Sequence, residues 1–186
     1  AIAKPIHAVR GQTLGLLGCG RIARCLAVKA QVFGIKVIAY DPYIKPEAVK
    51  DFGVTLVSRE ELLAQSDFIS MHLLLNEDTR KSINADFFKK MKNSAIFVNT
   101  ARGGLVDEDA LIEALRTGEI AGAALDVLTE EGIDKDAPLQ KFDNVIITPH
   151  AAWYSEQAFY TLLTSAAQEV VRALHGEPVK NQVNHF

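Results

Sequence analysis

The segment TLGLLGCGRIA, residues 13–23, joins a short apolar run to a glycine-rich turn and the start of a helix-like stretch. The turn GCGRIA has the pattern G-x-G-x-x-A. In such a unit Gly18 permits a tight turn, Gly20 lets a pyrophosphate come close to the backbone, and the small Ala23 lets the helix pack on the strand. The anion then meets the N–H groups at the helix N-terminus. The segment predicts a dinucleotide-binding turn; the plainer interpretation is an ordinary β-turn.

Short apolar runs alternate with helix-like segments along the rest of the chain. The runs lack strict polar alternation, which is typical of strands buried on both faces of a parallel sheet. Strand–helix alternation repeated six times predicts an α/β fold, a Rossmann-type doubly wound parallel sheet with helices on both faces. The apolar runs are 13–18, 36–41, 54–58, 68–73, 95–100, 122–128 and 145–150, and the segments between and after them are 21–34, 45–53, 59–66, 83–92, 107–118 and 155–176.

The composition argues against several other classes of protein. The chain has 186 residues, and its 20 basic and 23 acidic side chains give a net charge of −3, which offers no electrostatic case for nucleic acid. The sequence has no run of about 18 apolar residues, so no membrane span is predicted. The only two cysteines form no CxxC pair and no Cys/His cluster, so neither a disulfide framework nor a metal site is expected. We expect a reducing, cytoplasmic location.

An acidic residue, Asp41, ends the second apolar run. A carboxylate at this place accepts hydrogen bonds from the ribose hydroxyls of NAD and repels the 2′-phosphate of NADP. The cofactor predicted from the glycine turn and Asp41 together is therefore NAD.

Three further polar residues follow the ends of later apolar runs. Arg102 follows 95–100, Glu131 follows 122–128, and His150 ends 145–150. Ligands of open α/β sheets bind beyond the carboxyl ends of the strands, so these side chains are expected at one edge. Reduction of a ketone with a neighbouring carboxylate needs a carboxylate clamp, a proton donor and a group that tunes the donor. The alternatives are a surface arginine, a solvated glutamate, and a packed or helix-capping histidine.

Five segments, in their order and spacing, resemble the NAD-binding domain of the D-isomer-specific 2-hydroxyacid dehydrogenases. They are TLGLLGCGRIA, VIAYDPY, FVNTARGGLVDEDAL, AGAALDV and NVIITPHAAWYSEQA. The stretch PHAAWYSEQA looks most like the C-terminal-binding-protein branch, which contains dehydrogenase-like corepressors and related dehydrogenases. The resemblance implies a homodimer. It also implies a cofactor domain over residues 1–154 and a C-terminal helix and tail, 155–186, that would return to a substrate domain outside this chain.

The resemblance assigns roles to individual residues. Arg102 binds the substrate carboxylate, His150 is the acid/base, and Glu131 pairs with His150. Gly132 stands where the family usually has proline, so Glu130 remains open as the partner. The residues implied to line the dinucleotide are Gly18, Gly20, Arg21, Ile22, Asp41, Leu73, Asn76, Thr79, Thr100, Ala101, Arg102, Asp126, His150 and Trp153.

The function expected from these residues is NAD-dependent reduction of a 2-oxo acid to a D-2-hydroxy acid, or the reverse. The alternatives are an NAD(H)-responsive corepressor or scaffold with little turnover, and a purely structural Rossmann domain. The sequence does not identify the 2-oxo acid.

Overall fold

A computed structural model of the chain describes residues 7–130, 132, 137–180 and 182. Its contacts divide the chain into two compact units, Ala1–His150 and Ala151–Phe186. The boundary falls at His150, shortly before the expected one at residue 154. The first unit contains the sheet, and the second contains the long helix α5 (Glu156–Leu174).

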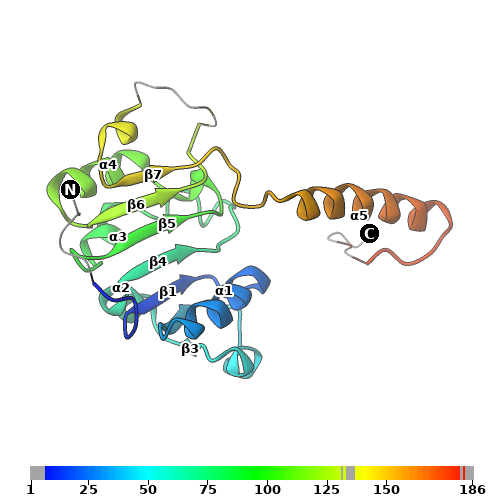
Figure 1. The fold of residues 1–186 in the computed structure, drawn as a ribbon, viewed down its shortest axis with the longest axis horizontal. Helices are drawn as coiled ribbons and strands as arrows, with labels where there is room; N and C mark the ends of the chain where they lie inside the picture. Colours follow the sequence, from blue (N-terminus) through cyan, green and yellow to red (C-terminus); the bar gives the residue numbers. More distant parts are fainter. Residues whose placement is uncertain (1–6, 131, 133–136, 181, 183–186) are drawn as a thin grey trace. The chain divides into compact units, whose positions relative to one another are not determined.

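The first unit is a seven-stranded sheet in the order β3-β2-β1-β4-β5-β6-β7, and every neighbouring pair is parallel (Figure 1). This is the doubly wound Rossmann arrangement, so the expected fold class is confirmed. The strands are β1 (Thr13–Leu17), β2 (Lys36–Tyr40), β3 (Thr55–Leu56), β4 (Phe68–Met71), β5 (Ile96–Asn99), β6 (Gly122–Leu125) and β7 (Val145–Ile147).

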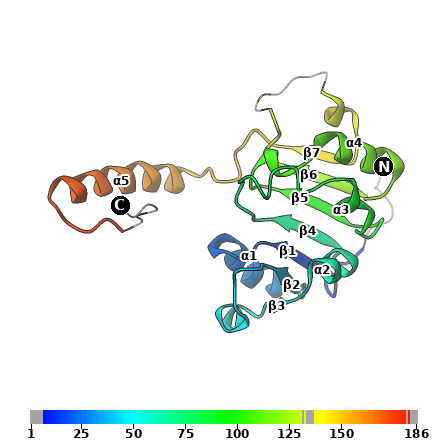
Figure 2. The ribbon, with the colours of Figure 1, turned by 180° about the vertical axis from the view of Figure 1, so that it is seen from behind.

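Helices cover the two faces of the sheet unequally (Figure 2). Helix α1 packs its alanine stripe on one face over β1 and β2, and the other three helices bury their apolar sides in the core of the opposite face. The phenylalanines of that core, Phe87, Phe88 and Phe97, meet edge to face. The helices are α1 (Arg21–Val32), α2 (Arg59–Gln65), α3 (Ala85–Lys89) and α4 (Glu108–Thr117).

The face that carries α1 becomes more exposed towards β7. A row of side chains in register begins with Leu16, which is fully buried, and ends with Ile146, which is 67% exposed. The expectation that all the strands are buried on both faces is therefore wrong for β7. β7 lies at the edge of the sheet, and α1 reaches only the β1–β2 end of this face.

Residues 45–53 form two short 3₁₀ turns, Pro46–Ala48 and Lys50–Phe52, rather than a helix. Pro46 begins the first turn, and Gly53 ends the second in the left-handed conformation at φ +61°. A further 3₁₀ turn, Gly103–Leu105, follows β5, and another, Pro138–Lys141, lies in the polar stretch before β7.

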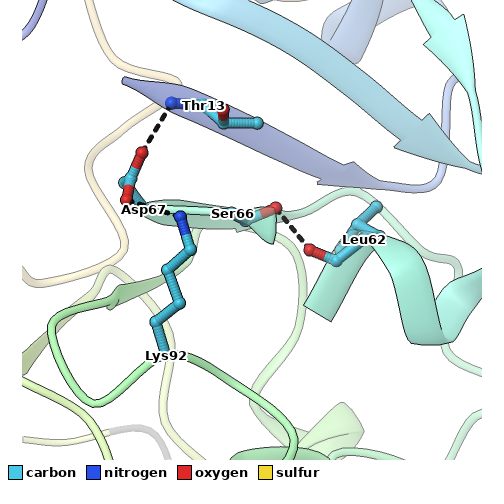
Figure 3. A network of polar contacts seen from close by, with 5 residues as sticks. All are labelled: Thr13, Leu62, Ser66, Asp67 and Lys92. Carbon is cyan, nitrogen blue, oxygen red and sulfur yellow. Dashed lines mark hydrogen bonds and ion pairs between the residues drawn. The ribbon is translucent and has the colours of Figure 1, made fainter. Parts of the chain in front are cut away.

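A polar cluster joins β1 to β4 at their amino ends, away from the edge where the expected site residues lie (Figure 3). Asp67 accepts hydrogen bonds from the backbone N–H of Thr13 at 2.8 Å and from Lys92 Nζ at 2.9 Å. Burial raises the pKa of the Asp67 carboxyl, but these two donors outweigh it and hold the pKa below 3.8. Next to it the buried Ser66 hydroxyl donates to the carbonyl of Leu62 at 2.6 Å. Of these bonds, the one from Thr13 to Asp67 joins β1 to the start of β4 and helps to set their register.

Candidate active site

A cleft of about 590 Å³ opens beyond the carboxyl ends of β1, β4 and β5. The strand order reverses between β1 and β4, and in open α/β sheets this switch point is where ligands bind. The cleft is lined by Gly20, Arg21, Ile22, Ala23, Met71, His72, Leu73, Leu74, Leu75, Thr100, Ala101 and Arg102. The glycine turn and the β5 arginine, which are far apart in the sequence, thus share one cleft.

The two glycines of the turn have different reasons to be glycine. Gly18 has φ +91°, and a Cβ there would lie 2.8 Å from the carbonyl oxygen of His72. Gly20 is the N-cap of α1 and makes no side-chain capping bond, and a Cβ there would meet no atom within 4 Å. The space beside Gly20 and the N-terminus of α1 therefore fit a phosphate group. Between the glycines, burial raises the pKa of the Cys19 thiol, so this side chain is a small, unreactive filler of the turn.

The carboxylate of Asp41 is tied to this turn. Its Oδ2 accepts from the N–H of Cys19 at 2.8 Å, and its Oδ1 accepts from the N–H of Tyr43 at 2.9 Å. An ionised carboxylate has about four acceptor positions, so each oxygen keeps capacity for a ribose hydroxyl. Asp41 thus lies beside the glycine turn, as the sequence predicted.

The loop after β4 brings only some of its expected residues to the cleft. Leu73 lines the cleft. Asn76 and Thr79 instead bond to each other: the N–H of each donates to the side chain of the other at 2.9 Å. The Thr79 hydroxyl also donates to the carbonyl of Leu74 at 2.6 Å. These two side chains shape the loop, and their expected contact with the dinucleotide remains a prediction.

The Arg102 loop is held by Asn99, a buried residue that the sequence reasoning did not single out. Asn99 Oδ1 accepts from the N–H of Ala101, and its Nδ2 donates to the carbonyl of Arg102, both at 3.0 Å. The next residue, Gly103, lies against the loop after β6, so that a Cβ on it would be 1.9 Å from the Leu128 carbonyl oxygen. The exposed Arg102 guanidinium donates to the carbonyl of Ala101 at 2.6 Å and reaches the cleft.

A second pocket, of about 410 Å³, lies at the carboxyl ends of β6 and β7. Asp126, Glu130, Thr148 and His150 line it together with Val127, Leu128, Gly132, Ile147 and Pro149. Asp126 is buried, at 4% exposure, and it accepts a hydrogen bond from the Thr148 hydroxyl. His150 stands in the left-handed region at φ +52°. Glu131, the expected partner of His150, lies outside the described residues.

His72 is a residue of the candidate site that the sequence analysis did not single out. It lines the first cleft, and its Nε2 lies 3.0 Å from the Ser70 hydroxyl. Burial lowers its pKa to about 4, so the imidazole is neutral at pH 7. The alternation of side chains along a strand gives no signal for such a residue.

The expected tryptophan, Trp153, belongs to the second unit. Its ring meets the ring of Tyr154 edge to face, with the centroids 5.5 Å apart. Its expected contact with the dinucleotide remains a prediction. Within the described part of the chain, no three metal-binding side chains gather closely enough to hold a metal ion. The helices of that part include none with the length and apolar character needed to cross a membrane.

The parallel sheet, the G-x-G-x-x-A turn, the acid that ends β2 and the cleft at the switch point define a dinucleotide-binding Rossmann domain. The sequence model described as "D-isomer specific 2-hydroxyacid dehydrogenase, NAD binding domain" matches residues 2–152. The chain therefore belongs to this family, and the cofactor of the domain is NAD. The resemblance to the family is confirmed, and the narrower likeness to the C-terminal-binding-protein branch stays a prediction.

Several relatives are similar over nearly the whole chain. D-3-phosphoglycerate dehydrogenase of Methanocaldococcus jannaschii is 46% identical over 94% of this chain and 33% of its own length. Glyoxylate reductase of Korarchaeum cryptofilum is 42% identical over 95% of this chain and 53% of its own length. The crystal structure of D-lactate dehydrogenase with NAD⁺ from Lactobacillus jensenii matches with a TM-score of 0.88 and 34% identity, over 96% of this chain and 57% of that one. This chain thus spans between a third and about half of the curated relatives it matches.

Proposed function

We propose that the protein is an NAD-dependent oxidoreductase that reduces a 2-oxo acid to a D-2-hydroxy acid, or catalyses the reverse reaction. The observation that carries this proposal is that three neighbouring strands, β5, β6 and β7, are followed within three residues by Arg102, Asp126 and His150 respectively. Arg102 lines the cleft at the switch point, and the other two line the adjoining strand-end pocket. A cation, a buried carboxylate and an imidazole at one sheet edge suit the reduction of a ketone that carries a carboxylate.

Each residue has a separate task in this reaction. Arg102 binds the substrate carboxylate through its planar fork and orients the ketone. His150 donates a proton to the ketone oxygen as the alcohol forms. Glu131 or Glu130 accepts a hydrogen bond from the imidazole and orients it. The location of Glu130 in the His150 pocket supports Glu130, while Glu131 remains the choice that the family resemblance implies. Bound NADH supplies the hydride that C2 of the substrate receives.

The test mixes the full-length protein with NADH and each of a panel of 2-oxo acids. The decrease in NADH absorbance measures the rate of reduction. Arg102→Lys keeps the charge but loses the fork, so we expect kcat/KM to fall roughly 10- to 100-fold. The matched control is Arg116→Lys, an exposed arginine paired with Glu113 on α4, which should leave the rate unchanged. NADH binding without turnover of any 2-oxo acid would favour the scaffold alternative. Failure to bind NADH would favour a purely structural domain.

We also propose that NAD is preferred over NADP, because the Asp41 carboxylate lies beside the glycine turn and would repel a 2′-phosphate. Calorimetric titration with both cofactors measures the preference. Asp41→Ala should narrow the difference between the affinities for NAD and NADP. Asp51 is an exposed carboxylate on a 3₁₀ turn, so Asp51→Ala should leave this difference unchanged. Equal or tighter binding of NADP by the unaltered protein would contradict the proposal.

We propose that the protein forms a homodimer and is located in the cytoplasm. Exposed apolar side chains at Val32 and Phe33, at the end of α1 and just beyond it, support self-association, and light scattering of Val32→Glu beside the unaltered protein tests it. The unpaired thiols of Cys19 and Cys25 suit a reducing compartment. The match of the family to residues 2–152 supports a cofactor domain over 1–154, with 155–186 as a segment that returns to a substrate domain.

A further inference from the structure

Thr148 ties the ends of β6 and β7 together. Its backbone N–H donates to the carbonyl of Leu125 at 2.9 Å and extends the pairing of the two strands by one residue. Its hydroxyl donates to Asp126 Oδ1 at 2.5 Å. This donor satisfies an acceptor oxygen of a side chain that is only 4% exposed and that water therefore reaches poorly. The side chain of Thr148 therefore anchors the buried Asp126 carboxylate.

The backbone of Thr148 also takes part in holding His150. The N–H of His150 donates to two carbonyl oxygens, that of Asp126 at 2.9 Å and that of Thr148 at 3.0 Å. His150 itself has φ +52°, a conformation that residues other than glycine rarely adopt and that the surroundings must maintain. Asp126 and Thr148 together provide such surroundings.

We infer that Thr148 is a positioning residue that fixes the Asp126 carboxylate and the His150 backbone relative to each other at the mouth of the strand-end pocket. This inference rests on the proposed function, in which His150 delivers the proton. Replacing the hydroxyl by a methyl group of the same shape would remove one donor from a carboxylate that is only 4% exposed. The carboxylate would then turn towards other partners or water, and the 148–150 segment would lose its side-chain anchor to β6.

The test compares Thr148→Val with Thr148→Ser in the full-length protein. Valine has nearly the shape of threonine but no hydroxyl, and serine keeps the hydroxyl. We expect Thr148→Val to lower kcat about 10-fold or more, the size of one hydrogen bond to a charged group. The KM for the 2-oxo acid should stay within about 2-fold, because Arg102 lies on a different loop, held by Asn99. Thr148→Ser should restore kcat. Unchanged kcat in Thr148→Val, no rescue by serine, or an effect confined to KM would each overturn the inference.

Hydrogen exchange of the backbone provides a readout that does not need turnover. The His150 N–H should exchange about 10-fold faster in Thr148→Val than in Thr148→Ser. The control is the N–H of Phe97 in the core: equal exchange rates in the two variants there would show that the fold is intact. Equal exchange at His150 in the two variants would overturn the inference. If the unaltered protein reduces no 2-oxo acid, the proposed function fails, and the exchange result still decides whether Thr148 holds this segment.

Discussion

Gly103→Ala should cost this protein more stability than an alanine placed at an exposed turn, because Gly103 is buried. A Cβ at Gly103 would lie 1.9 Å from the carbonyl oxygen of Leu128 and 2.6 Å from the backbone N of Thr129. Both are backbone atoms, so a rotamer change cannot relieve the overlap. The loops after β5 and β6 must separate by about 1.5 Å or more to bring this pair to an ordinary contact of at least 3.4 Å. Overpacking typically costs about 1–3 kcal/mol, and a clash with backbone belongs at the upper end, about 3 kcal/mol.

Urea unfolding followed by circular dichroism measures the loss. With a slope of about 2 kcal/mol per molar urea, the midpoint should fall by about 1.5 M. Gly104→Ala is the matched control: its Cβ would meet a methyl group of Leu75 at 3.0 Å, and that flexible side chain can move. We expect a loss below about 1 kcal/mol there. Equal midpoints for the two variants would refute the reasoning, because they would show that the two loops are not in firm contact at Gly103.

Three further results are expected. Gly20→Ala should lower the urea midpoint only slightly, because its Cβ would meet no atom but alanine is a poorer N-cap than glycine. It should weaken NADH binding roughly 5- to 150-fold in a fluorescence titration. Unaltered affinity would show that the dinucleotide does not approach this residue. Burial of His72 favours its neutral form, so between pH 6.5 and about 4 this histidine binds a proton in the unfolded chain but not in the native protein. The free energy of unfolding should therefore fall by up to about 3 kcal/mol over this range. His72→Gln should remove this part of the acid sensitivity in unfolding curves. The lowered pKa of Asp67 stabilises the native state above the ordinary pKa of the carboxyl, and this stabilisation is lost as the pH falls through the pKa of the folded protein. Asp67→Asn should therefore flatten the plot of unfolding free energy against pH below about pH 4. An unflattened plot would mean that the Lys92 contact contributes little.

The fold followed from the sequence because its local signals agree with its global arrangement. Acidic residues in the first turn of 107–118 and Gly118 at its end predicted a helix, and α4 runs from Glu108 to Thr117 with Gly118 left-handed at φ +72°. The segment 45–53 gave a weaker pattern, and Pro46 and Gly53 leave only two single turns there. The exposure of Ile146 could not be predicted, because strand order and helix coverage are tertiary properties.

The sequence predicts those residues of the candidate site that follow the end of a strand. It does not predict the residues that hold another site residue in place. Arg102 and His150 were expected from the general rule that ligands lie at the carboxyl ends of strands, whereas Asp126 was implied only by the family resemblance. Asn99 and Thr148 each hold such a residue by a hydrogen bond that depends on a loop conformation or on the pairing of two strands. Such bonds join atoms whose proximity is created by folding, so the spacing of residues along the chain does not encode them.

The seam between β1 and β4 divides the sheet into two halves that carry different expected site residues. Asp41, the residue expected to choose between NAD and NADP, belongs to the β1–β3 half, whereas Arg102, Asp126 and His150 belong to the β4–β7 half. The sheet pairs the halves only through β1 and β4, and their register is helped by the Asp67 contact with Thr13 at the far end from the cleft. An exchange of one half between members of the family, made at this seam, should therefore transfer cofactor choice without transferring substrate choice. Evolution could vary the two properties independently for the same reason.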